Sequence, residues 1–162
     1  ACLLMFVSSC GSQVYMESDK VNTTLESTNL AFSAKSALPN NVDVLNVMNS
    51  NPGGNPGRIM KLDTGYGFVI KDNELTVTLP YFGRMYNASM GRENNSFRFT
   101  SKDYRVSKSK NKKGNWIVNI SVNDYKSNPN LVLEVDKNGG AFLSVNANDR
   151  QPISYDGFIT EN

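Results

Sequence analysis

The sequence predicts an all-β fold, an antiparallel meander of eight or nine short strands that forms a closed or strongly curved barrel. Three observations predict it. From residue 29 onward, apolar and polar residues alternate with a period of two, the alternating runs are short, and turn residues separate them. Because consecutive short strands usually pair and a curled sheet hides its edges, a barrel is the economical arrangement, with a lipocalin-like architecture as one form of it.

The first half of the predicted sheet contains four strands. The first begins at Leu30, and the second and third flank Asp72-Asn73, which is typical of a tight β-hairpin turn. The fourth is a short run around residues 97–99. The side chains expected to face inward are Leu30, Phe32, Ala34, Tyr66, Phe68, Ile70, Leu75, Val77, Leu79, Phe97 and Phe99.

The second half contains the remaining strands. One begins at Tyr104 and the next at Trp116, and Lys137-Asn138-Gly139-Gly140 predicts the turn of a later hairpin. The last run ends near Ile159. The alternating side chains of these runs are Tyr104, Val106, Trp116, Val118, Ile120, Val122, Leu131, Leu133, Val135, Leu143, Val145, Ile153, Tyr155 and Ile159.

One stretch between the first two strands departs from this period. Residues 44–48 carry apolar side chains at a spacing that indicates one or two helical turns. Residues 49–57 are rich in proline and glycine, which indicates a surface loop.

The first ten residues resemble the end of a bacterial lipoprotein signal peptide. An apolar run leads into Val7-Ser8-Ser9-Cys10, which is similar to a lipobox, in which a small residue precedes the acylated cysteine. Two or more acyl chains hold a protein stably at a membrane, so a lipid on Cys10 would anchor this chain. The alternative is a buried first strand with a free thiol. We therefore expect three parts: residues 1–9 as a truncated signal peptide, residues 10–28 as lipid attachment and flexible tether, and residues 29–162 as a single β domain.

The residues that follow Cys10 bear on location. Residues 11–28 are mostly polar and show no convincing period, which favours a tether that lifts the domain off the membrane. They contain no acidic run of the kind associated with surface export. We therefore expect the protein in the bacterial cell envelope, on the periplasmic face of the outer membrane.

The composition argues against several classes of function. The chain contains no histidine, which excludes Ser-His-Asp and Cys-His nucleophile systems and most catalytic zinc sites. Its net charge of +2 is too balanced to indicate a nucleic-acid partner. Asp63-Thr64-Gly65 matches the tripeptide of aspartic proteases, but its continuation does not, and we interpret it as a turn. We expect no enzyme activity, no cofactor and no metal site.

The most unusual segment is Leu79–Tyr86, where aromatic residues gather around an arginine. Binding surfaces favour aromatic residues and arginine, so Tyr81, Arg84 and Tyr86 are candidate contact residues. The alternative is a structural corner, in which the rings pack on the core and Arg84 satisfies carbonyl groups at a strand end.

Several motifs, taken together, resemble a domain-of-unknown-function family of Bacteroidetes lipoproteins. They are Gly65-Tyr66, Leu79-Pro80-Tyr81-Phe82-Gly83-Arg84 with Tyr86, Asp103-Tyr104, the run at 112–116, Asn138-Gly139, and Arg150-Gln151-Pro152-Ile153-Ser154-Tyr155 with Gly157. The resemblance covers about residues 29–160. It implies a lipid-anchored, mostly β envelope domain and no particular activity. The segment from Asn40 to Gly57 is longer than the family pattern.

Two functions remain open at this point. The first is a non-catalytic binding or interaction module, held at the membrane by its lipid, with an unidentified protein or small molecule as partner. The alternative is a carrier that holds a small apolar ligand inside the barrel, which requires an open lumen. An enzyme that uses carboxylates or a metal ranks below both.

Overall fold

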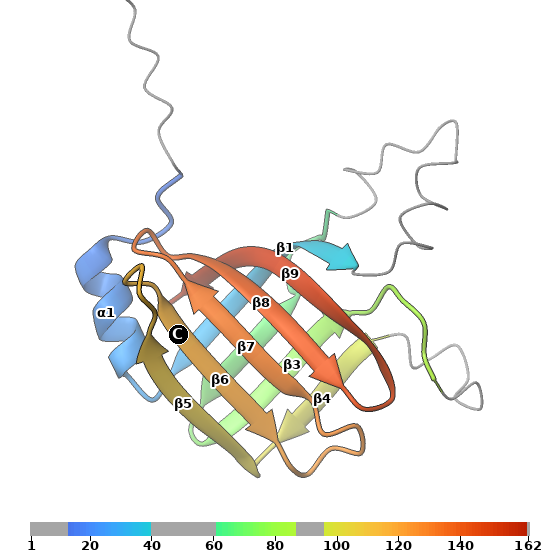
Figure 1. The fold of residues 1–162 in the computed structure, drawn as a ribbon. Coiled ribbons are helices and arrows are strands. Elements are labelled where there is room, and N and C mark those ends of the chain that lie inside the picture. Colours follow the sequence, from blue (N-terminus) through green and yellow to red (C-terminus); the bar gives the residue numbers. More distant parts are fainter. Residues whose placement is uncertain (1–12, 40–60, 87–95, 162) are drawn as a thin grey trace, which may run out of the picture.

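The computed structural model describes residues 13–39, 61–86 and 96–161. Within them, nine antiparallel strands form one sheet, and a helix covers one end of it (Figure 1). The elements are α1 (Ser18–Glu26), β1 (Leu30–Pro39), β2 (Gly67–Lys71), β3 (Glu74–Pro80), β4 (Ser96–Ser101), β5 (Tyr104–Lys110), β6 (Trp116–Val122), β7 (Asn130–Val135), β8 (Gly140–Ala147) and β9 (Arg150–Thr160). The predicted all-β meander is confirmed.

The sheet is a strongly curled half-barrel whose free edges lie in the middle of the sequence. The strand order is β4-β3-β2-β1-β9-β8-β7-β6-β5, so the first strand pairs with the last. β4 and β5 follow each other directly in the chain, yet they form opposite edges of the sheet. Strands that follow each other in the sequence therefore pair in the sheet in each case except β4 and β5.

Alternation of side chains explains the strands. In β7 the residues at positions 131, 133 and 135 are fully buried, while the positions between them are partly exposed. The hairpin turn between β2 and β3 has Asp72 at φ 52° and Asn73 at φ 61°. Two successive residues with positive φ give the turn a twist that matches that of the flanking strands, and Asn and Asp tolerate this conformation best after glycine.

Two glycines let the neighbours of β1 approach it closely. A Cβ atom on Gly67 would lie 1.8 Å from the carbonyl oxygen of Phe32, and one on Gly157 would lie 2.0 Å from that of Ser33. Directly after this point, the register of β1 against β9 shifts between Ala34 and Ser36. The extra residue of this bulge is Lys35, and such bulges bend a strand and increase its twist.

The prediction of a flexible tether is wrong for residues 18–26, which form α1. Val21 is 2% exposed and Leu25 is fully buried, so one turn of this otherwise polar helix packs against the half-barrel. Asn22, between them, accepts a hydrogen bond of 2.9 Å from the indole nitrogen of Trp116. Two apolar residues four positions apart are too weak a pattern to predict a helix. The helix is stabilised mainly by packing of these two side chains on the sheet, which a local pattern does not reveal.

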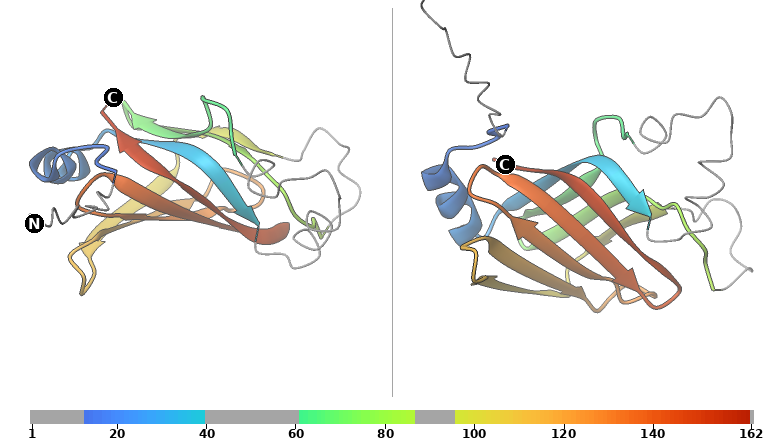
Figure 2. Two further views of the ribbon diagram at one scale, coloured as in Figure 1. Left: turned by 90° about the horizontal axis from the view of Figure 1, so that it is seen from above. Right: turned by 45° about the horizontal axis from the view of Figure 1, so that its top comes forward.

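Figure 2 shows α1 at one end of the curled sheet, close to the end of β9. We call this the near end, and we call the opposite end, where β9 begins at Arg150, the far end. Lys108 of β5 donates a 2.6 Å hydrogen bond to the carbonyl oxygen of Ser27, just past the helix. Cys10, the predicted helical turns at 44–48 and the predicted loop at 49–57 lie outside the described residues.

Candidate functional site

The segment after β3 forms a pinned corner at the far end. The hydroxyl of Tyr81 donates hydrogen bonds to the carbonyl oxygens of Arg84 (2.9 Å) and Gln151 (3.1 Å). The amide of Gln151 donates to the same Arg84 carbonyl at 3.1 Å, and the amide of Tyr86 donates to the carbonyl of Asp149 at 2.8 Å. These bonds join residues 81–86 to the start of β9.

A buried arginine lies beneath this corner. Arg150 is 2% exposed, and its guanidinium makes two hydrogen bonds to the Asp149 carboxylate, at 2.9 and 2.8 Å. The guanidinium carbon Cζ of Arg150 also lies 5.0 Å from the ring centre of Tyr81 and 4.6 Å from that of Phe97. The hydrogen bonds from Arg150 hold the pKa of the Asp149 carboxyl below its usual value. A buried cation is tolerable here because both a carboxylate and two aromatic faces surround it.

Tyr155 completes the cluster from the middle of β9. Its side chain is fully buried, and its hydroxyl donates a hydrogen bond to the carbonyl of Pro80 at the end of β3. Burial raises the pKa of this hydroxyl well above its usual value. The sequence placed Tyr155 correctly in the core, but it did not identify Arg150 as a core residue, because arginine is almost never buried without partners and those partners come from distant strands.

The three predicted contact residues separate at this corner. Tyr81 is 4% exposed, so its inclusion in a contact surface is wrong: its ring packs on Phe97 and its hydroxyl holds the corner together. Arg84 is exposed, and Tyr86 is 61% exposed. The structural-corner interpretation therefore fits Tyr81, while Arg84 and Tyr86 remain predicted contact residues.

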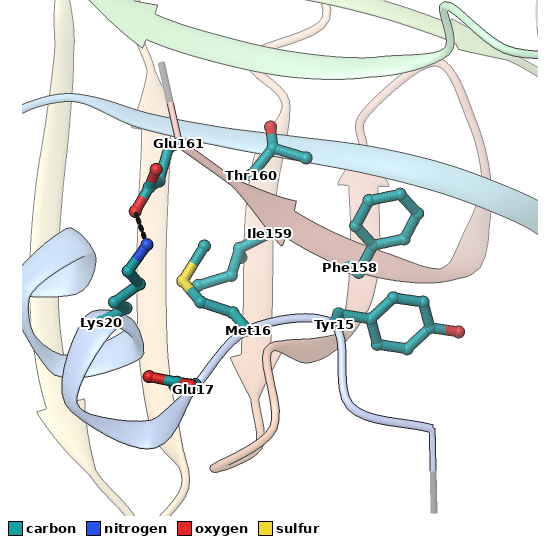
Figure 3. A pocket seen from close by; sticks show the side chains of 8 residues that line it. All are labelled: Tyr15, Met16, Glu17, Lys20, Phe158, Ile159, Thr160 and Glu161. Atoms are coloured by element: carbon teal, nitrogen blue, oxygen red, sulfur yellow. Dashed lines mark ion pairs between the residues drawn. The ribbon is translucent and has the colours of Figure 1, made fainter.

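A second set of exposed groups lies at the near end, where the chain enters the fold. The amides of Tyr15 and Met16 both donate to the carbonyl of Asn138 at 2.9 Å. The Tyr15 ring stacks on Phe158 with centres 4.7 Å apart and planes 2° apart, and the ammonium of Lys35 donates to the Tyr15 hydroxyl at 2.9 Å. That hydrogen bond raises the pKa of Lys35. Figure 3 shows the hollow of about 450 Å³ beside this stack, closed on one side by the Lys20–Glu161 ion pair.

The bulge in β1 opens a shallow groove next to this stack. The groove has a volume of about 510 Å³ and contains the carboxylates of Asp63 and Asp156 beside Lys35 and Lys61. All four side chains are exposed. A carboxyl group becomes an effective acid at neutral pH through burial, and neither of these carboxylates is buried. The groove can bind polar groups, but its geometry does not favour acid–base chemistry.

The space between the two halves of the sheet is filled by side chains. Phe68 and Phe97 are 1% exposed, and Phe99 is 9% exposed, as predicted for inward-facing rings. Trp116 is partly exposed and packs at the rim of the core. Close packing of these rings argues against the carrier, which needs an open lumen.

The described residues offer neither a metal cluster nor a membrane-spanning helix. Residues 13–39, 61–86 and 96–161 contain no group of three cysteine, aspartate or glutamate side chains placed to hold a metal ion. In the same part of the chain, no helix is long and apolar enough to cross a bilayer.

Comparisons with known proteins place the chain in a family. No curated protein matches it. A crystal structure of a DUF4251 family protein from Bacteroides eggerthii DSM 20697 matches with a TM-score of 0.54 and 13% sequence identity, over 88% of this chain and 85% of that chain, which shows a shared fold. The predicted resemblance to a domain-of-unknown-function family is confirmed, while its lipoprotein part stays a prediction. The model of the family described as "Domain of unknown function (DUF4251)" matches residues 13–159, nearly the whole chain, and the chain therefore belongs to the DUF4251 family.

Proposed function

We propose that this protein is a lipid-anchored envelope protein that binds a partner without catalysing a reaction. The anchor is a lipid on Cys10, supported by the lipobox-like sequence Val7-Ser8-Ser9-Cys10. The location is the periplasmic face of the outer membrane. The partner is an unidentified protein or small molecule, and no nucleic acid, metal or cofactor takes part.

The contact surface in this proposal is the exposed part of the far-end corner, Arg84 and Tyr86. The observation that carries it is that Tyr86 is 61% exposed on an ordered backbone. Its amide donates a hydrogen bond to the carbonyl of Asp149, and the Tyr81 hydroxyl donates one to the carbonyl of Arg84. An aromatic ring on an already ordered segment loses little conformational entropy when it binds. Aromatic residues and arginine are also the side chains that contribute most to binding at interfaces.

The anchor is tested by removing the thiol that would carry the lipid. In Cys10→Ser we expect loss of radiolabelled palmitate incorporation and release of the protein from membranes into the soluble fraction. Cys2→Ser is the matched control and should keep both label and membrane association. A Cys10→Ser protein that still sediments with membranes after a high-salt wash would contradict the anchor.

The contact surface is tested by photo-crosslinking in whole cells. A photoreactive phenylalanine analogue replaces Tyr86 in one variant and Val106, an exposed residue on the β5 edge, in the control. We expect a discrete adduct from position 86 that Arg84→Ala weakens, and none of that size from position 106. Identical adduct patterns from both positions would show that the corner has no special role in binding.

A further inference from the structure

The path of the chain at the near end limits how far the domain can stand from a membrane. Tyr15 and Met16 are fixed to the β7–β8 turn by two hydrogen bonds, and Tyr15 is also fixed by its stack on Phe158. The folded unit therefore begins at residue 15, and only four residue steps separate Cys10 from Val14. At about 3.5 Å per residue, these steps span at most about 14 Å.

This length is short compared with the domain. β9 contains 11 residues, which at about 3.3 Å each makes the strand about 36 Å long from the far end to the near end. A lipid on Cys10 would place that residue at the boundary between headgroups and acyl chains. The near end then lies next to the bilayer, and the far end with Tyr86 points away from it. This differs from the sequence interpretation, in which a long tether lifted the domain off the membrane.

An exposed apolar patch lies where this arrangement requires contact with lipid. Val14 is 62% exposed and Phe142 is 42% exposed. Phe142 faces outward on β8, and the register places it diagonally next to Phe158 on β9, because Phe142 pairs with Asp156 and Gly140 pairs with Phe158. Tyr15 stacks on Phe158 and turns its hydroxyl toward Lys35. Aromatic rings with one polar end are typical of the interface between water and lipid.

The charges around this patch select the kind of bilayer. Lysines and carboxylates are nearly balanced there, so the patch gains no electrostatic attraction from an anionic surface. The groups are Lys20, Lys35, Lys61, Lys110, Lys112, Lys113 and Lys137 on one side and Glu17, Asp63, Glu134, Asp136, Asp156 and Glu161 on the other. A zwitterionic surface therefore suffices for contact.

We propose that the near-end face formed by Val14, Tyr15, Phe142 and Phe158 rests on a zwitterionic bilayer. This inference rests on the proposed lipid at Cys10 and adds an orientation to it: the anchor holds the patch on the headgroups, and the far-end corner faces the aqueous space. The short connection keeps the patch at a high effective concentration near lipid, so weak individual contacts suffice.

The test attaches the protein chemically, so that it does not depend on acylation in cells. The full chain with Cys2→Ser keeps one thiol, Cys10, which is coupled to a maleimide lipid in phosphatidylcholine vesicles that contain brominated acyl chains. Trp116→Phe removes the single native tryptophan. A new tryptophan is then introduced either by Phe142→Trp at the near end or by Tyr86→Trp at the far end. Circular dichroism checks that both variants fold.

We expect brominated lipid to lower the fluorescence of the tryptophan at 142 at least about twofold, because interfacial side chains lie within the reach of quenchers near the headgroup boundary. The tryptophan at 86 should keep its fluorescence. Quenching at 142 should need coupling to the lipid and should not increase when a third of the lipid is phosphatidylglycerol.

Equal quenching at both positions, or stronger quenching at 86, would overturn the proposed orientation. An increase with anionic lipid that disappears in high salt would overturn the zwitterionic surface. If Cys10 is not acylated in cells, the anchor alone is contradicted. If brominated lipid does not lower the fluorescence of the tryptophan at 142 in coupled vesicles, the near-end face alone is contradicted.

Discussion

The two ends of the half-barrel are held by different kinds of interaction. At the far end, Arg150 lies fully within the protein, bonded to Asp149 and covered by the rings of Tyr81 and Phe97. At the near end, α1 is held by two apolar side chains and by hydrogen bonds from side chains that water reaches. The far end concentrates its stability in a few buried polar groups, and the near end distributes it over several weaker contacts.

The contrast shows which side chains remain available to contact another molecule. The aromatic segment that looked like a binding surface contributes much of its chemistry to its own fold, through Tyr81. The polar segment that looked like a tether contributes α1 to the fold. Among the described residues, the most exposed aromatic side chains are Tyr86 at the far end and Phe142 at the near end.

Removing the buried cation should destabilise the protein most. Arg150→Ala leaves the Asp149 carboxylate without its partner and removes the packing between two rings, so we expect the free energy of unfolding to fall by about 4 kcal/mol. Urea denaturation followed by circular dichroism measures it. Arg105→Ala, at an exposed arginine on the edge strand β5, is the control and should change little. Equal losses in the two variants would mean that the far end does not depend on its buried charge.

Truncating the fully buried leucine of α1 should come next. Leu25→Ala removes the side chain that closes the near end, and we expect a loss of about 3 kcal/mol in the free energy of unfolding. Val14→Ala, at a 62% exposed apolar position just before the helix, should stay within about 0.5 kcal/mol of the wild type. If Leu25→Ala is as mild as Val14→Ala, α1 does not help to hold the fold.

Removing the Tyr155 hydroxyl should take a hydrogen bond away from the carbonyl of Pro80. We expect Tyr155→Phe to lower the free energy of unfolding at pH 7 by about 2 kcal/mol. Tyr86→Phe, at the exposed tyrosine, is the control and should be neutral.

The same pair of proteins should differ in alkaline solution. Burial raises the pKa of the Tyr155 hydroxyl, so the folded protein keeps this proton at a pH where the unfolded chain has lost it. Its contribution to stability is complete below about pH 10, the pKa of an unfolded tyrosine, and declines as the pH rises further. Urea titrations from pH 8 to 11 should show the gap between wild type and Tyr155→Phe closing above pH 10. A gap that widens there would contradict the burial of this group.

The smallest effect should come from the hydrogen bond between α1 and β6. Asn22→Ala removes the acceptor of the Trp116 indole and should cost about 1 kcal/mol more than Thr23→Ala, which gains the same helix propensity on the exposed side. The emission of the single tryptophan should shift in Asn22→Ala only. Unchanged emission in both variants would show that this bond does not order the near end.

The strands were predictable from the sequence because their cause is local. Alternation in the runs around Phe68, Val77 and Leu133 reflects the two-residue repeat of a pleated strand, and Asp72-Asn73 tolerates the positive φ angles of a tight turn. The candidate contact site was predictable only as a segment. Which of its residues face water depends on β4 and β9, which bring Phe97 and Gln151 to Tyr81 from elsewhere in the chain.

We could predict the all-β class, the strands with their turns, and the inward-facing rings from the sequence alone, since each follows from steric rules that act over a few residues. The folded molecule was needed to show that β1 pairs with β9, that α1 closes one end, and that Arg150 lies in the core. Each of these depends on surfaces that distant parts of the chain bring together, and burial of a charge or of a lone turn of helix becomes favourable only when those surfaces are in place.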